Sequence, residues 1–397
     1  MSVKFLSCNG IGLSPLDILA SFFQSSPQLP DGYGFTDRQA IFTYQGRYAV
    51  HFICRLLNIG PGAEVLAPAY NCGAEIDPFV WAGAKVVFYR VDERGAIDTQ
   101  DIIRRVTAST KLVYVSHFFG WPQDIEALSR WCRGNKLFLL EDCALCLFSE
   151  GPQKTIGRIG DAAIYSFVKS LPVPDGGALV LKNKDAWKGK TPFRPPPFRN
   201  ILLNSLPLLK KWFMNANPLW QKYDLTRQLL NKSWLKKPMN QDQEIEREMP
   251  QSNYFDPQKI EWSISRLSKR ILSKTSPQEI IEARRRNYQY LHDALRNVPS
   301  IRLLFDALPD GVCPLSFPIY VNDRNCWAQA LENHGILVGG WPSYHRGFSW
   351  KDFPEARHLK NDLLTLPLHQ GLALHQMAYI AECVQSIAKD HGHHYSR

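Results

Sequence analysis

Between residues 64 and 140, short apolar runs alternate with segments whose apolar residues recur at helical spacing. The apolar runs predict strands and the spaced segments predict helices. A succession of this kind is typical of a largely parallel sheet buried between helices, and therefore of an α/β fold. The strands are expected at residues 65–68, 85–89, 112–117 and 137–140, and the helices at residues 72–83, 99–106 and 124–133.

The segment from Ile164 to Val180 combines two apolar runs with a turn-rich centre, and Lys169 is its only basic residue. The Pro, Asp and Gly residues after this lysine predict a strand end, a tight loop and a return strand. Local sequence leaves two interpretations of Lys169 open. It is either a solvated loop cation, which is the common case, or a Schiff-base lysine that is held beside a cofactor aldehyde.

An amphipathic helix is expected from Gly46 to Leu57, before the Gly and Pro residues at positions 60–62. A glycine at a helix start exposes backbone N–H groups that suit a phosphate, and Arg47 could add a charged clamp. A helix that merely begins after a turn is an equally good interpretation of this stretch.

Polar residues follow several of the predicted strands. Tyr70 and Cys72 follow the strand at 65–68, His117 follows another, and Asp142 follows the apolar run at 137–140. In parallel sheets, ligands gather outside the carboxyl ends of the strands. A carboxylate directly after an apolar strand is expected to be buried and to need a partner. Asp142 is therefore either a functional residue or one half of a structural ion pair.

The pattern divides the chain into four parts. Residues 1–40 are expected to form an N-terminal arm, and residues 41–184 a large α/β domain. Residues 185–250 break the alternating rhythm and predict an insertion or lid, while residues 251–397 predict a helical connector and a smaller α+β domain. An apolar stripe with Lys and Trp at residues 201–220 suits packing within the protein or on a partner subunit, or contact with a membrane surface.

Composition narrows the class of protein. A chain of 397 residues with 45% hydrophobic and 12% aromatic residues is globular with a sizeable core. Nine scattered cysteines without zinc-site spacing predict no metal site, and without a signal-peptide pattern they indicate a reducing cytoplasm. The net charge of +10 suits phosphorylated substrates or anionic surfaces, but no nucleic-acid-binding motif accompanies it. No apolar run approaches the roughly 20 residues of a membrane span.

Several short motifs follow one another along the chain: NIGPGAEVLAP at 58–68, WAGAKVVF at 81–88, SHFFGWP at 116–122, EDCA at 141–144, GDAAIYSF at 160–167, FPEARHL at 353–359 and LTLPLH at 364–369. In this order they resemble the DegT/DnrJ family of pyridoxal-phosphate-dependent sugar aminotransferases. The resemblance runs from about Phe42 to the C-terminus and is weakest over residues 185–250. It implies the fold type I architecture, with a mostly parallel central sheet and a smaller C-terminal α+β domain.

The resemblance assigns roles to residues of this chain. Lys169 stands at the position of the Schiff-base lysine, and Asp142 at that of the carboxylate that keeps the pyridine nitrogen protonated. Gly46, Arg47 and Ser166 stand where the family binds the phosphate of the cofactor.

Four further residues are candidates for cofactor contact. Tyr70 and Cys72 flank the position from which an aromatic ring covers the cofactor, and His117 ends a neighbouring strand. Asn253 resembles a residue that approaches the cofactor from the neighbouring subunit, which implies a homodimer with shared active sites.

The sequence also departs from the family's pattern. The segment between Ser166 and Gly177 is shorter, so that the lysine follows the serine by three positions. Leu145 replaces a glutamine that contacts the ring, and Phe255 replaces an arginine two residues after Asn253. The lysine, the aspartate and the phosphate position of the family remain in this chain, whereas its substrate is expected to differ from the family's.

The resemblance implies an aminotransferase that moves an amino group from an amino acid, glutamate first among the candidates, to a keto sugar that is nucleotide-linked. Such a reaction belongs to glycan or secondary-metabolite biosynthesis. A sugar dehydratase or lyase is a second hypothesis, but the relatives that dehydrate carry histidine in place of the lysine, and Lys169 argues against it. A third hypothesis is a non-catalytic scaffold, to which Leu145 and Phe255 lend weight.

Overall fold

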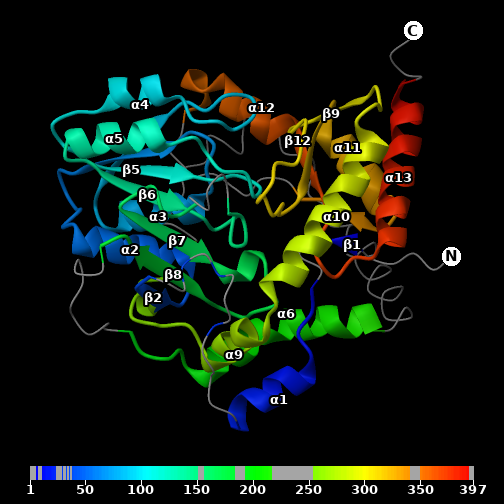
Figure 1. The fold of residues 1–397 in the computed structure, drawn as a ribbon, viewed down its shortest axis with the longest axis horizontal. Helices are drawn as coiled ribbons and strands as arrows, with labels where there is room; N and C mark the ends of the chain where they lie inside the picture. The colour runs from blue at the N-terminus through cyan, green and yellow to red at the C-terminus, as the bar shows by residue number, and fades with distance from the viewer. Residues whose placement is uncertain are drawn as a thin grey trace.

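A computed structural model of the chain describes residues 6–7, 11–23, 29, 33, 35, 38–150, 156–183, 193–216, 254–339 and 349–392. The described elements are arranged around a large and a small sheet (Figure 1). Asn253 and residues 217–220 of the apolar stripe lie outside the described residues.

The large sheet has seven strands in the order β2-β8-β7-β6-β5-β3-β4. The pairings among β3 to β7 are parallel, whereas β8 runs antiparallel to both of its neighbours, β7 and β2. The strands are β2 (Ala40–Thr43), β3 (Glu64–Pro68), β4 (Lys85–Tyr89), β5 (Thr110–Ser116), β6 (Phe138–Asp142), β7 (Ala162–Ser166) and β8 (Gly177–Leu181). Every residue of β3, β7 and β8 is buried, as expected for strands covered on both faces. The predicted α/β class and largely parallel sheet are therefore confirmed.

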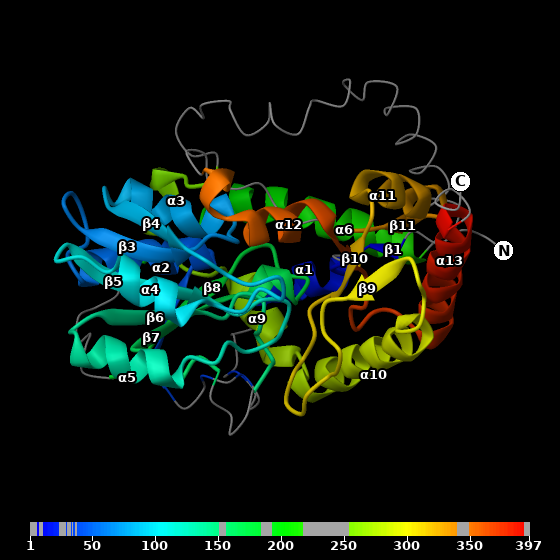
Figure 2. The ribbon, with the colours of Figure 1, turned by 90° about the horizontal axis from the view of Figure 1, so that it is seen from above.

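Helices cover both faces of this sheet (Figure 2). α2 (Gly46–Leu56) and α3 (Gly73–Trp81) pack on the face to which Val65 and Tyr114 point. α4 (Thr99–Arg105) and α5 (Glu126–Gly134) pack on the opposite face, which receives Leu66 and Val115. The alternation of residues between the two clusters follows the period of two in a strand.

The small sheet has the order β12-β10-β9, and its pairings are antiparallel. Its apolar face packs with the long helices of the C-terminal part, which stand beside the large sheet in Figure 1. The elements are α10 (Pro277–Leu295), β9 (Ile301–Leu303), β10 (Phe317–Val321), α11 (Arg324–Asn333), α12 (Pro354–Asp362), β12 (Leu363–Leu366) and α13 (Leu374–Gly392). This mixture of strands and helices agrees with the α+β character that the sequence predicts for the C-terminal part.

The N-terminal segment reaches both parts of the molecule. β1 (Leu6–Ser7) pairs in parallel with β11 (Ile336–Leu337), while α1 (Pro15–Phe23) lies beside α9 (Arg266–Lys274). α6 (Phe198–Ala216) is the helix that the structure describes within the predicted insertion. None of the described helices combines the length and the apolar character that crossing a membrane requires.

Candidate active site

Six of the predicted site residues line one pocket at the carboxyl edge of the large sheet. The pocket is open to solvent and encloses about 520 Å³. Strands end at this edge and helices begin there. Together they bring six residues into one pocket: Gly46, Arg47, Cys72, Asp142, Ser166 and Lys169. These residues are far apart in the sequence, and the parallel topology of the sheet is what joins them.

Lys169 projects from a single turn between β7 and β8. The turn η2 (Phe167–Lys169) is held by the fully buried ring of Phe167 and by its amide, which donates to the carbonyl of Gly176 at 3.1 Å. This anchor leaves Lys169, two residues later, exposed on the pocket wall. Within the part of the chain that the structure describes, the amine of Lys169 makes no hydrogen bond or ion pair. The amine is therefore available to a ligand in the pocket.

Asp142 is the last residue of β6 and is 3% exposed. Its carboxylate is fixed by two donors, the hydroxyl of Tyr114 on Oδ2 and the amide of Ala144 on Oδ1 at 2.7 Å. Burial raises the pKa of this carboxyl, while these hydrogen bonds and the Lys169 amine act in the opposite direction. The same burial raises the pKa of Tyr114 well above its usual range, so the hydroxyl remains a donor. The sequence did not single out Tyr114, because a tyrosine within a strand resembles any other core residue.

Glu75 is a second carboxyl in the pocket that the sequence analysis missed. It lies in the first turn of α3, where its Oε2 accepts from the amide of Cys72 at 3.4 Å. Burial and the nearby Asp142 raise the pKa of Glu75 to about 8. The spacing of Cys72 and Glu75 matches that of a capping box, which was the available signal. Glu75 therefore carries a proton at neutral pH, in the same pocket as Asp142.

The phosphate position predicted at Gly46 is the N-terminus of α2. The preceding residue, Gln45, forms no side-chain cap on the helix, so the first amides remain available to an anion. Gly177, at the start of β8, lies against this turn: a Cβ on Gly177 would be 2.4 Å from the Gly46 nitrogen. Ser166 pairs with Gly177 in the β7–β8 ladder and lines the same pocket. Only a glycine at position 177 lets the strand and the helix start approach so closely.

Arg47 lines the pocket but is already engaged. One of its Nη atoms donates to the carbonyl of Tyr254, and the guanidinium carbon lies 5.9 Å from the centroid of the Tyr254 ring. Phe255, next in the chain, packs its ring on Tyr48 and His51 at centroid distances of 5.3 and 5.1 Å. Phe255 thus anchors the segment that follows Asn253 at the edge of the pocket.

Cys72 and Tyr70 have different positions although they are two residues apart. Cys72 lines the pocket, and burial raises the pKa of its thiol to about 11, so the thiol is neutral. Tyr70 is fully buried against Phe118 at a centroid distance of 5.1 Å and does not line the pocket. Leu145 is buried in the same cluster as Tyr70. Of the two candidates for covering the cofactor, only Cys72 reaches the pocket.

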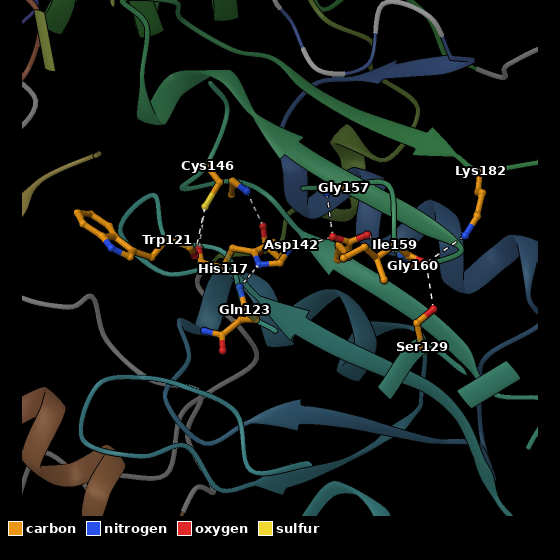
Figure 3. Close-up of polar contacts among 12 residues, drawn as sticks. His117, Trp121, Gln123, Ser129, Asp142, Cys146, Gly157, Ile159, Gly160 and Lys182 are labelled. Atoms are coloured by element: carbon orange, nitrogen blue, oxygen red, sulfur yellow. Dashed lines mark hydrogen bonds and ion pairs between the residues drawn. The ribbon is translucent and has the colours of Figure 1, made fainter. Parts of the chain in front are cut away.

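His117 lies outside the pocket as well. Its Nδ1 accepts from the amide of Gln123 at 2.9 Å, so Nε2 carries the proton and faces Oε2 of Glu141 at 3.0 Å (Figure 3). The Glu141 carboxylate also accepts from the amides of Gly157 and Gly160. Adjacent strand residues point to opposite faces, so Glu141 and Asp142 diverge. Together with Cys143, His117 and Glu141 place three possible metal ligands within 4.8 Å of one another, but these hydrogen bonds already use the carboxylate.

Comparison with known proteins places this pocket in a family. The profile of the DegT/DnrJ/EryC1/StrS aminotransferase family matches residues 34–197. The dTDP-4-dehydro-2,3,6-trideoxy-D-glucose 4-aminotransferase of Saccharopolyspora spinosa is 30% identical over 190 residues, which cover 44% of this chain and 49% of that protein. The chain therefore spans about half the length of this relative. The spore coat polysaccharide biosynthesis protein SpsC of Bacillus subtilis (strain 168) is 25% identical over 86% of this chain and 83% of its own length.

Solved structures show the same fold. The putative sugar aminotransferase Spr1654 from Streptococcus pneumoniae, in its PMP form, has a TM-score of 0.69 at 16% identity, with 98% of each chain covered. The fold is that of the fold type I aminotransferases, as the sequence motifs predict. Over residues 34–197, a segment that makes up less than half of this chain, the sequence is similar to the DegT/DnrJ/EryC1/StrS aminotransferase family.

Proposed function

We propose that this protein is a pyridoxal-phosphate-dependent aminotransferase that moves an amino group from an amino acid to a nucleotide-linked keto sugar. The observation that carries the proposal is the unengaged amine of Lys169, which shares a pocket with the buried carboxylate of Asp142. A lysine and a carboxylate across one cavity match the two ends of a pyridoxal ring.

The residues present fit this cofactor. Pyridoxal phosphate has an aldehyde, a pyridine nitrogen and a phosphate, and the pocket offers a partner for each: Lys169, Asp142 and the N-terminus of α2. Ser166 and Arg47 stand beside that helix start. When bound, the cofactor supplies an electron sink for reactions at the α-carbon of an amino acid.

The ionisable side chains of the pocket have separate roles in proton transfer. Asp142, held by Tyr114 and the Ala144 amide, would hold the pyridine nitrogen of the cofactor and favour its protonated form. The Lys169 amine would be the base that takes the α-proton of the amino donor and the acid that gives a proton back. Glu75, with its raised pKa, adds no second negative charge beside Asp142 at neutral pH.

The relatives support the class of acceptor. The Saccharopolyspora spinosa protein is named for a 4-aminotransferase acting on a dTDP-linked 4-dehydro sugar, and SpsC is named for spore coat polysaccharide biosynthesis. We extend the nucleotide-linked keto sugar to this chain, with glutamate as the first donor to test. From the resemblance at Asn253, we also propose a homodimer in which this segment completes the neighbouring site. Free cysteines throughout the described residues support a reducing compartment, the cytoplasm.

The absorption spectrum of the purified protein, titrated with glutamate, tests the proposal. The protein is expected to bind the cofactor with the absorbance of a lysine-linked form and to lose that band when the donor is added. Lys169→Ala should abolish both, whereas Lys111→Ala, which changes an exposed lysine of β5, should change neither. A Lys169→Ala protein that keeps the band and the activity would refute the assignment. A wild-type protein that binds no cofactor would favour the non-catalytic scaffold.

A further inference from the structure

A buried positive charge that has no partner among the described residues lies near the loop that follows Lys169. Arg270 of α9 is 4% exposed, and its Nε is enclosed with no hydrogen-bond acceptor. Among the residues that the structure describes, its guanidinium makes no hydrogen bond or ion pair. Arginine does not lose its proton in proteins, so it cannot become neutral when it is buried. Buried charges are otherwise paired, because an isolated one carries a large desolvation cost.

Arg270 lines a cavity between α1, α9 and the loop after Lys169. The helices α1 and α9 lie in the lower part of Figure 1. The cavity encloses about 490 Å³ and is open to solvent. Leu13 of the segment before α1 and Pro172 of the loop form apolar walls, and Thr275 closes the end of α9. None of its lining residues lines the pocket of Lys169, so the two sites are separate.

The other charged residues of the cavity do not neutralise Arg270. Lys274, one helical turn after it, adds a second positive charge at the exposed side. Asp17 is the acidic residue among the lining side chains, and its Oδ2 accepts from the hydroxyl of Ser14 at 2.7 Å. The cavity therefore has a net positive charge of one, with two cations on one wall of α9.

We propose that this cavity binds a small oxyanion, a phosphate or carboxylate group, on the guanidinium of Arg270 with Lys274 at the rim. Guanidinium forks match the two oxygens of such groups. The group belongs either to a free anion or to an acidic side chain of a second copy of this chain. The site is independent of the proposed aminotransferase activity, because it shares no residue with that pocket.

Thermal unfolding of the full chain tests the free-anion source. The protein is saturated with pyridoxal phosphate, so that the α2 N-terminus is occupied, and is titrated with inorganic phosphate against chloride of equal ionic strength. The melting temperature should rise saturably by about 2 °C or more in the wild type. Arg270→Met should abolish the rise, and Arg266→Met, which changes an exposed arginine of the same helix, should preserve it.

A second variant keeps the test decisive if Arg270→Met does not fold. Arg270→Lys retains a positive charge without the fork, so it should need roughly tenfold more phosphate for the same rise. An equal phosphate response in wild type, Arg270→Met and Arg270→Lys would overturn the proposal as an adventitious ion only. The same phosphate titration is repeated without pyridoxal phosphate. The difference between wild type and the Arg270 variants can then be measured even if the protein binds no cofactor.

Sedimentation velocity over a range of protein concentrations tests the second source. If an acidic side chain of a second copy occupies the cavity, Arg270→Met should weaken self-association roughly tenfold or more, and phosphate should compete with that association. The proposal would be overturned if phosphate did not change the melting temperature and if Arg270→Met did not change self-association.

Discussion

Glu141 and Asp142 are adjacent acidic residues at the end of one strand, yet they serve two different regions. The Glu141 carboxylate faces the α5 side of the sheet, where His117 and the amides of Gly157 and Gly160 use its oxygens. The Asp142 carboxylate faces the α2 side, where two donors hold it beside the pocket of Lys169. The Glu141 carboxylate is engaged by the protein's own donors, which makes its side the closed one, whereas Asp142 lies in a pocket with the unengaged amine of Lys169, which makes its side the open one. The comparison shows that burial alone does not mark a functional carboxylate; the direction of the side chain decides.

The largest effect is expected from removing the charge on the open side. Asp142→Asn should lower kcat by about 10²–10³-fold, because the ring nitrogen of the cofactor loses the charge that keeps it protonated. The unfolding free energy should stay the same or rise, because an amide is easier to bury than a carboxylate. Steady-state kinetics with glutamate, together with urea unfolding, measure both. A variant that is destabilised yet fully active would reverse the assignment of the two regions.

The matched change on the closed side should have the opposite signature. Glu141→Gln replaces one acceptor oxygen by a donor amide that faces the amides of Gly157 and Gly160 and the Nε2 of His117. The unfolding free energy should fall by about 3 kcal/mol. The fraction of correctly folded protein should retain its kcat. Urea unfolding with active-site titration separates the two quantities, and a selective loss of kcat at unchanged stability would contradict the comparison.

The last prediction concerns the pH dependence of the unfolding free energy, to which Glu75 contributes on the open side it shares with Asp142. Its pKa is raised to about 8 in the folded chain, so between about pH 4.5 and pH 8 the folded state holds a proton that the unfolded state has released. The unfolding free energy should therefore fall as the pH rises through this window, by up to about 4 kcal/mol. Glu75→Gln should remove this part of the fall. Urea midpoints of both proteins near pH 5 and pH 8 test it, and parallel pH profiles would show that Glu75 is already ionised.

Sequence patterns were sufficient for the frame of the molecule. Runs such as residues 85–89 alternate with helical segments so regularly that the parallel sheet could be predicted from periodicity. Asp142 could be predicted as well, because a charge directly after an apolar strand is conspicuous. Gly46 and Lys169 were open on local evidence and gained roles from motifs far away in the chain.

For residues at the ends of strands, the sequence did not predict which face of the sheet the side chain points to. Tyr70 and His117 follow strands just as Cys72 and Asp142 do, but the chain turns there and the period of two no longer fixes direction. Glu75 looked like an ordinary acidic residue in the first turn of a helix. The sequence analysis did not single out Arg270, which is buried on α9 beside the cavity that α1 and the loop after Lys169 also line.

The pairing of Ser166 with Gly177 has a consequence for how this site can change. Both residues stand beside Gly46, so the loop that carries Lys169 leaves the sheet and returns to it at one point. The ladder closes the loop in the manner of a hairpin, and residues added or removed between its ends need not shift the helix start. A protein built in this way can alter the reach and the neighbours of its lysine while the phosphate position stays fixed. The shortened loop of this chain is such an alteration, and the choice of substrate can diverge here without the loss of the cofactor site.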